Sequence, residues 1–316
     1  MLFRSACSAL VALCMPAVAG AADYFQVRNE NQLARAVPLP VLAPDSPEPG
    51  QLDFGTRLDL SNEYANLQAA DEALLADGEV AKLTLSASGR FTAATHWSVR
   101  LPVLHQGGGF LDGTISDWHD FFGLPNGGRE FAVDDRYLFA YAENGETLLR
   151  VDDKGTRIGD LEVAWHWEPA ERWLLGAHLQ VPTGDGDKLA GGGAIGAAVW
   201  ATRRFAAGPL DAFLSGGVAV SEPGDILPDR QRRTIPFGGA GIGLRLFDWM
   251  RAVTQVYAHR ASFSDTDINT LGRDSVQLSV GAVFRLPGKT RLHLLFQEDL
   301  GVYASPDFSV QAALYW

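Results

Sequence analysis

Cysteine is almost absent from this sequence, because its two cysteines, Cys7 and Cys14, both lie in the first 22 residues. The rest of the chain therefore has no disulfide, no thiolate metal ligand and no cysteine nucleophile. It also lacks any apolar run of the roughly 18 to 20 residues that a membrane-spanning helix needs, so a bilayer span must be made of strands. Basic residues are few, since 26 Lys and Arg stand against 38 Asp and Glu, a net charge of −12 that argues against a nucleic-acid partner.

Acidic residues are missing from residues 1–22, where Arg4 precedes an apolar run from Ala9 to Ala12 and then several small residues. This order is typical of a secretory signal peptide. Cleavage after Ala19, Ala21 or Ala22 would satisfy the small-residue requirement, and we favour Ala22. Removing Arg4 leaves 25 of the 26 basic residues against 38 acidic ones, a net charge of −13 for the remaining chain.

The last nine residues alternate between a polar face and a face made of Phe308, Val310, Ala312, Leu314 and Trp316. This pattern predicts a strand that continues to the end of the sequence. Outer-membrane β-barrels commonly end on such a strand, and its final aromatic residue helps the assembly machinery to recognise the protein. We therefore expect Phe308, Leu314 and Trp316 to act as an assembly signal.

Similar alternation recurs in segments close to the roughly ten residues of a tilted membrane strand. Short and long connections between these segments alternate along the whole chain, as in outer-membrane barrels with short periplasmic turns and long external loops. A two-sheet sandwich has no reason to sort its loops in this way. The sequence therefore predicts an all-β fold, a transmembrane antiparallel β-barrel of about twelve strands. The expected strands are residues 51–62, 80–91, 93–104, 157–168, 171–183, 193–205, 209–221, 236–247, 249–262, 274–287, 289–299 and 306–316.

The predicted barrel covers residues 51–316 and follows an N-terminal arm at residues 23–50. Five prolines between Pro38 and Pro49 argue for an extended arm, either in the periplasm or tucked into the lumen. The longest connection, 105–156, is expected to be an external or lumen-inserted loop. Within it, Tyr137 to Val151 has the pattern of a hairpin, which would lengthen the loop or add two strands.

The 105–156 loop also contains a predicted short amphipathic helix between glycine-rich turns, because Leu111, Ile115, Trp118 and Phe122 follow helical spacing. Such a helix could rest on the barrel mouth or the lipid interface, or it could line or gate a substrate path. For a lid, plug or path the candidate residues are His105, Phe110, Asp112, Trp118, His119, Phe122 and Arg129.

Three stretches resemble an uncharacterised bacterial family, domain of unknown function 3187. They are Gly107 to Arg129, the segment Arg28-Asn29-Glu30-Asn31-Gln32-Leu33, and Pro182-Thr183-Gly184-Asp185 to Leu189 with the following Gly191-Gly192-Gly193. The third stretch also resembles barrels suspected of passing hydrophobic compounds. The resemblance implies a cell-surface barrel and supplies no catalytic residues, because the family has no established activity.

Enzymatic chemistry has weak support in the sequence. Ser116, His119 and Asp112 are the compact candidates for a lipid hydrolase, but no Gly-x-Ser-x-Gly elbow is present. Asp185 and Asp187 could offer oxygen ligands to calcium, yet the twelve-residue calcium-loop pattern is missing and turn chemistry explains them equally well. We expect no metal site and no cofactor.

Charged residues of both signs fall on the predicted interior face, so no ring of one sign is expected and the charges could pair within the lumen. The lumen-lining residues are predicted to be Arg57, Arg90, Arg100, Asp160, Glu162, Arg245, Arg251 and Arg285, together with Asp53, Asp59 and His293.

The leading hypothesis is a passage for small, hydrophobic molecules in the outer membrane of a Gram-negative bacterium. The expected partners are membrane lipids, the barrel-assembly machinery and the transported molecules. A structural or adhesive surface barrel and a lipid-active enzyme are the alternatives.

Overall fold

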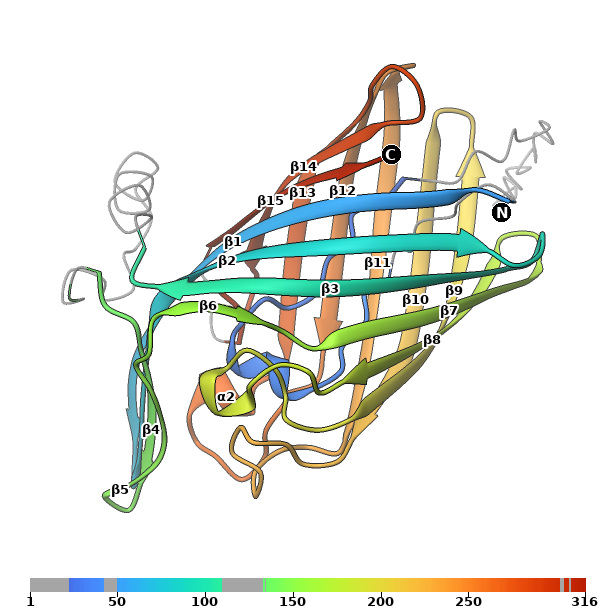
Figure 1. Cartoon of the computed structure of the whole chain (residues 1–316). Coiled ribbons are helices and arrows are strands. Elements are labelled where there is room, and N and C mark those ends of the chain that lie inside the picture. The colour runs from blue at the N-terminus through green and yellow to red at the C-terminus, as the bar shows by residue number, and fades with distance from the viewer. Residues whose placement is uncertain (1–22, 43–49, 110–132, 134, 302–303, 307) are drawn as a thin grey trace, which may run out of the picture.

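The computed structural model describes residues 23–42, 50–109, 133, 135–301, 304–306 and 308–316. Twelve antiparallel strands close into a barrel, as the sequence predicts, with the last strand paired to the first (Figure 1). In order around the barrel they are β1 (Leu52–Ala69), β2 (Glu72–Arg90), β3 (Thr95–Gly107), β7 (Leu161–Ala170), β8 (Trp173–Val181), β9 (Gly196–Ala207), β10 (Leu210–Ser221), β11 (Thr234–Phe247), β12 (Met250–His259), β13 (Ser275–Arg285), β14 (Arg291–Asp299) and β15 (Phe308–Tyr315).

Closure depends on β15, whose residues pair with β1 from Tyr315 opposite Gly55 to Phe308 opposite Asn62. Beyond the strand, the Trp316 and Phe54 backbones exchange two hydrogen bonds of 2.9 Å. Leu314 and Trp316 are exposed on the outer wall, whereas Ala313 and Tyr315 are buried on the inner side. The strand therefore shows the alternation that its sequence predicts.

The outer wall exposes many large apolar side chains, as the outward face of a transmembrane barrel does. Its exposed aromatic residues gather beside the short connections, an end of the barrel that we call the turn end; the opposite end is the loop end. Near the turn end Phe91 stacks on Trp165 with ring centroids 5.1 Å apart, and Phe247 stacks on Trp249 at 5.4 Å. No helix among the described residues is long and apolar enough to cross a membrane.

One predicted loop is wrong. Residues 62–80 were expected to form a long connection, but β1 and β2 continue through them as a hairpin that turns at Ala70 and Asp71. The inner side of this extension buries Leu74 and Ala76, and these two side chains explain why the strands continue despite the many polar residues around the turn.

The connection 105–156 is not a simple loop, because it contains β4 (Leu138–Glu143), β5 (Glu146–Val151) and the start of β6 (Gly155–Ile158). The β4–β5 hairpin predicted between Tyr137 and Val151 is present and pairs with the extended part of β2, beyond the end of β3. It projects from the loop end of the barrel in Figure 1. β6 pairs with β3 just beyond β7, so that β6 and β7 form one wall strand broken at Gly159 and Asp160.

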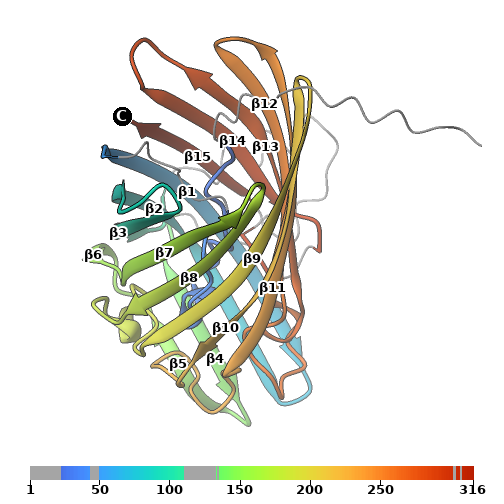
Figure 2. The same ribbon diagram turned by 90° about the vertical axis from the view of Figure 1, so that its right-hand side faces the viewer.

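The N-terminal arm runs inside the barrel. Figure 2 shows it in blue within the ring of strands. Asp23 lies near the turn end, where Arg285 and Arg291 bind it, and the arm rises to a 3-10 helix, η1 (Leu33–Ala36), near the loop end. It then descends past β8 and β12, where His178 and Tyr257 contact Pro38 and Pro40. The sequence left two positions open for the arm, the periplasm and the lumen, and the arm occupies the lumen.

Gly176 on β8 makes room for a large lumenal side chain. A Cβ atom at this position would lie 2.2 Å from the indole ring of Trp200 on the neighbouring strand β9, and Trp200 is almost completely buried. We predict that Gly176→Ala destabilises the barrel by about 1–3 kcal/mol, because the added methyl group overpacks this site. Urea unfolding in detergent micelles, followed by tryptophan fluorescence, measures the change.

The matched control is Gly216→Ala on β10, where a Cβ atom would have no heavy atom within 4 Å. An equal loss of stability in the two variants would contradict the proposed clash.

Candidate functional site

The arm contains no strand between residues 23 and 42, so its backbone has no sheet ladder to satisfy its polar groups. Lumenal side chains take that role. The Gln255 side chain accepts a hydrogen bond from the Phe25 N–H at 2.6 Å and donates one to the Phe25 carbonyl at 3.2 Å. One amide group thus replaces both hydrogen bonds that a neighbouring strand would make.

Other arm groups are satisfied in the same manner by side chains from several strands. The Gln26 carbonyl accepts from Arg57 at 2.9 Å and from Gln311 at 3.3 Å. Further donors reach the carbonyls of Arg28, Ala36 and Pro40, and the donors are Gln297, Gln231 and Tyr257 respectively. The arm is therefore bound to the wall by individual side chains.

A buried group of four charges joins the arm to β1 and β2. Glu30 of the arm pairs with Lys82 and lies 3.7 Å from Arg57. Asp59 lies 2.9 Å from Arg57 and 3.4 Å from Lys82, which is its register partner across the strands. All four side chains are nearly inaccessible to solvent. Because each charge has at least one opposite neighbour, the group can be buried without leaving any of them uncompensated.

A second group centres on Glu162 of β7. Arg28 of the arm binds its carboxylate at 2.6 Å, while Arg100 lies 3.9 Å away and the His178 ring 3.8 Å away. Arg100 also donates a hydrogen bond of 3.3 Å to the side chain of Gln26. The arm therefore meets paired charges along the wall formed by β1, β2, β3 and β7.

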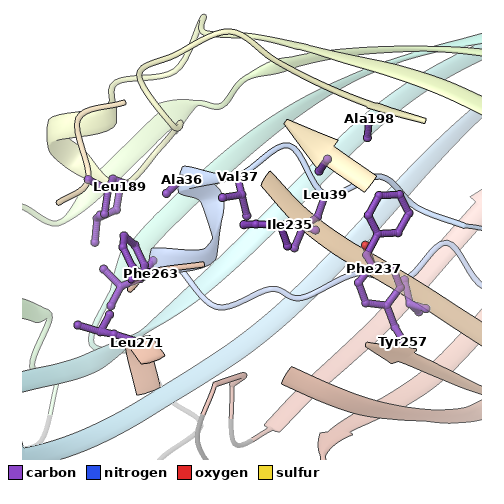
Figure 3. Packing of buried hydrophobic residues seen from close by; sticks show 14 of the residues in the cluster. Ala36, Val37, Leu39, Leu189, Ala198, Ile235, Phe237, Tyr257, Phe263 and Leu271 are labelled. Atoms are coloured by element: carbon purple, nitrogen blue, oxygen red, sulfur yellow. The ribbon is translucent and has the colours of Figure 1, made fainter. Parts of the chain in front are cut away.

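The opposite side of the lumen carries a cluster of apolar side chains beside uncharged polar ones such as Gln255 and Gln297. Figure 3 shows the side chains of Val37 and Leu39 directed towards Ile235, Phe237 and Tyr257 of β11 and β12. The same buried cluster continues with Phe25 and Leu42 of the arm and with wall residues Trp200, Phe213, Val253, Val283 and Leu295. The lumen thus has one side rich in paired charges and another on which an apolar cluster stands beside uncharged polar side chains, and the arm contacts both.

Asp160 organises the wall where β6 and β7 are interrupted. Its carboxylate accepts hydrogen bonds from the backbone N–H groups of Gly184 and Gly192, at 2.9 and 2.8 Å, and from Gln180 at 2.7 Å. The Thr183 hydroxyl donates to the Gly159 carbonyl and accepts from the Leu161 N–H. The segment 182–193 is therefore folded inwards, with Leu189 fully buried against the arm.

A cavity lies between this inward segment, the arm and the wall formed by β2, β3 and β7. It encloses about 440 Å³ of space not occupied by atoms, part of which is open to solvent. Its lining is amphipathic: apolar Ala34, Val37, Leu39, Pro102, Leu104 and Ala190 stand beside charged Arg28, Glu30, Arg35, Lys82, Asp160 and Glu162.

The loop end is tied together around Glu72 on the extended part of β2. Its carboxylate accepts from the Tyr141 hydroxyl at 2.5 Å and from the Asp267 N–H at 2.7 Å. Arg230 lies 3.4 Å from Glu72 and also pairs with Glu143, whose hydrogen bond raises the pKa of this arginine. In the next loop, burial and the neighbouring Asp187 and Asp185 raise the pKa of Asp225.

The chain matches the family model described as a protein of unknown function, DUF3187, over residues 3–315. The chain belongs to this family. No curated protein matches it. Among solved structures it is similar to the COG4313 outer membrane channel from Pseudomonas putida F1, with 14% identity, a TM-score of 0.56, and coverage of 86% of this chain and 96% of that one. It has weaker likenesses to the KdgM porin (7% identity, TM-score 0.44, 84% and 98% covered) and to the toluene transporter TodX from Pseudomonas putida (8%, 0.41, 92% and 98%).

In this DUF3187 member, two of the stretches that resemble the family lie at the site. Residues 28–33 form the part of the arm that carries Arg28 and Glu30, and residues 182–193 form the inward segment around Asp160. Most of the stretch from Gly107 to Arg129 lies outside the described residues, and so do the helix predicted within it and Phe110, Asp112, Ser116, Trp118, His119, Phe122 and Arg129.

Four of the predicted lumen-lining residues lie together against the arm: Arg57, Arg100, Asp160 and Glu162 are buried, and all but Asp160 bind arm atoms. Four others lie towards the turn end, where Arg90 pairs with Glu168, Arg251 with Asp211 and Arg285 with Asp23, while Arg245 is exposed.

His105 does not lie on a path through the barrel. Its neighbours Leu104 and Gln106 are buried on the inner side of β3, so His105 faces outwards, where it is exposed and its Nδ1 lies 3.0 Å from the Thr156 hydroxyl. The side chain alternation of β3 thus directs this predicted lid or path residue away from the lumen.

Several residues of the site escaped the sequence analysis, among them Lys82, Gln255, Gln297 and Gln311. A signal was present, since glutamines occupy the polar face of β12, β14 and β15 although such residues pack poorly in an apolar interior. Glutamine offers both a donor and an acceptor, which suits it to bind a stretch of backbone.

We predict that Lys82→Met lowers the free energy of unfolding by about 3–5 kcal/mol, because Glu30 and Asp59 would stay buried with Arg57 as the remaining cation of their group. The urea midpoint in micelles reports the loss, and limited proteolysis of the arm reports whether it leaves the lumen.

Lys154→Met is the control, since Lys154 pairs with Asp135 on the exposed surface and its loss should change stability by less than about 0.5 kcal/mol. If Lys82→Met were as stable as this control, the charge group would not hold the arm.

Proposed function

We propose that this barrel is a passage for small, hydrophobic molecules across the outer membrane, and that the arm at residues 23–42 is its movable plug. The observation that carries the proposal is the filling of the lumen by a segment without sheet pairing. A twelve-stranded barrel is wider than its own inward side chains fill, so the arm occupies the room that a solute would need.

The mode of attachment supports movement of the arm. Each hydrogen bond between the arm and a lumenal side chain contributes about 0.5–1.5 kcal/mol, and water can replace either partner when the arm leaves. The wall strands keep their own ladder of backbone hydrogen bonds throughout. Displacement of the arm therefore requires no strand of the barrel to open.

The character of the lumen supports a hydrophobic solute over an ion. Withdrawal of the arm would uncover the apolar cluster that includes Phe213, Phe237 and Tyr257. On the other side, cations and anions pair along the wall, as Asp59 does with Arg57 and Lys82, so there is no ring of one sign to select ions.

The proposal extends to the route by which the protein reaches its membrane. Residues 1–22 act as a signal peptide that is cleaved after secretion, in a Gram-negative bacterium. The outward Leu314 and Trp316 of β15 are offered to the assembly machinery, and the apolar outer wall contacts membrane lipids. In the finished barrel, the short turns face the periplasm.

A disulfide between the arm and the wall tests the plug. A Cβ atom at Gly196 of β9 would lie 2.8 Å from the Pro38 Cβ, so Pro38→Cys with Gly196→Cys can form a disulfide after a small shift. Cys7 and Cys14 are replaced by serine. We expect cells that produce this variant to take up the apolar dye N-phenyl-1-naphthylamine only when the disulfide is reduced.

The oxidised and reduced forms of one protein are matched controls, and each single-cysteine variant controls for the oxidant. Equal dye uptake in both forms, with the disulfide verified by mass spectrometry, would refute an arm that must move. Uptake no higher than in cells without the protein would refute the passage itself.

A further inference from the structure

Arg35 differs from the other lumenal cations of the arm and of β1 and β2. Arg28, Arg57 and Lys82 each pair with at least one carboxylate. Arg35, in η1, donates one hydrogen bond of 2.8 Å from Nη1 to the Leu189 carbonyl, and no carboxylate of the described residues forms an ion pair with it. Glu30 and Glu63 compensate its charge from a longer distance, so the guanidinium has no carboxylate in direct contact.

A guanidinium removed from bulk water needs either an anion or a full set of hydrogen-bond acceptors. It has five N–H donors, and the Leu189 carbonyl uses one of them. The remaining donors include the pairs that bind a carboxylate through both of its oxygens. Arg35 thus has the free capacity that a bidentate anion requires.

The surroundings restrict which anion fits. Arg35 lines the cavity described above, where apolar Ala34, Pro102, Leu104 and Ala190 provide one part of the wall. Acidic Glu30, Asp160 and Glu162 provide another part, and they disfavour a ligand with two or more negative charges. A ligand with one negative charge and a short apolar body satisfies both parts of the lining.

We propose that Arg35 and this cavity form a binding site for a small monocarboxylic acid, with the carboxylate on the guanidinium and the apolar body against Pro102 and Leu104. The site deepens the proposed function, on which its role in transport rests, by giving a class of solute. Because Arg35 belongs to the plug, the acid binds where the arm meets the wall.

Binding of hexanoate to the full chain in detergent micelles tests this site, with neutral hexanamide as the matched ligand. We expect calorimetry to show that the protein binds hexanoate more tightly than hexanamide. Arg35→Gln should weaken hexanoate binding about tenfold or more and leave hexanamide binding unchanged. Arg150→Gln, which removes an exposed arginine paired with Asp152, should change neither affinity.

Equal affinity for hexanoate in Arg35→Gln and in the unchanged protein would overturn the site, and so would equal affinity of the unchanged protein for hexanoate and hexanamide. Should Arg35→Gln fail to fold, the second comparison decides alone. The dye experiment separates this site from the passage. If hexanoate binding depends on Arg35 but the cells take up no dye, the binding site is supported and the passage is refuted. If the cells take up dye but hexanoate binding does not depend on Arg35, the passage is supported and the binding site is refuted.

Discussion

The structure depends on one constraint, that every backbone polar group inside a bilayer must find its partner within the protein. Pairing of β15 with β1 meets this constraint for the wall, because a closed barrel has no free edge. It also creates a second need, since twelve strands enclose more space than their inward side chains fill. The arm fills that space but brings its own unpaired backbone, and the lumenal glutamines, Arg57 and Tyr257 are the groups that satisfy it.

Buried ion pairs are weak sources of stability, since removing charges from water costs about as much as their attraction returns. Their contribution here is better understood as alignment of the arm. Glu30 lies between Lys82 and Arg57, and Arg28 binds Glu162. The wall charges therefore require a cation at position 28 of the arm and an anion at position 30. A shift of the arm by one residue would separate both pairs, whereas the apolar contacts of Val37 and Leu39 would tolerate small displacements.

Strand positions were readable from the sequence because inward and outward residues alternate with a period of two, as in β13 and β15. The same rule failed at residues 62–80, where polar residues such as Asn66 and Gln68 resemble a loop and the reason for the strands lies in distant Phe139 and Tyr141, which are buried on the same side as Leu74. The arm could not be placed with certainty, since its side chains follow no period and its partners are some 30 to 290 residues away in the chain. Asp160 was expected in the lumen from its register, but its role in holding the segment 182–193 depends on backbone N–H groups that the sequence does not display.

The division of the lumen into two sides bears directly on what the plug does. On the side rich in paired charges the wall contributes Arg57, Lys82 and Arg100 against Asp59 and Glu162, and the arm contributes one cation, Arg28, and one anion, Glu30, to these groups. Arg28 and Glu30 have opposite charges, so their withdrawal leaves the summed charge of these groups unchanged, and the wall charges can still pair with one another. In the apolar cluster nothing replaces Val37 and Leu39 when they leave, so water would contact Phe237 and Tyr257. The penalty for an empty lumen thus falls on this cluster, and an apolar solute is the kind of molecule that removes this penalty by taking the place of the arm.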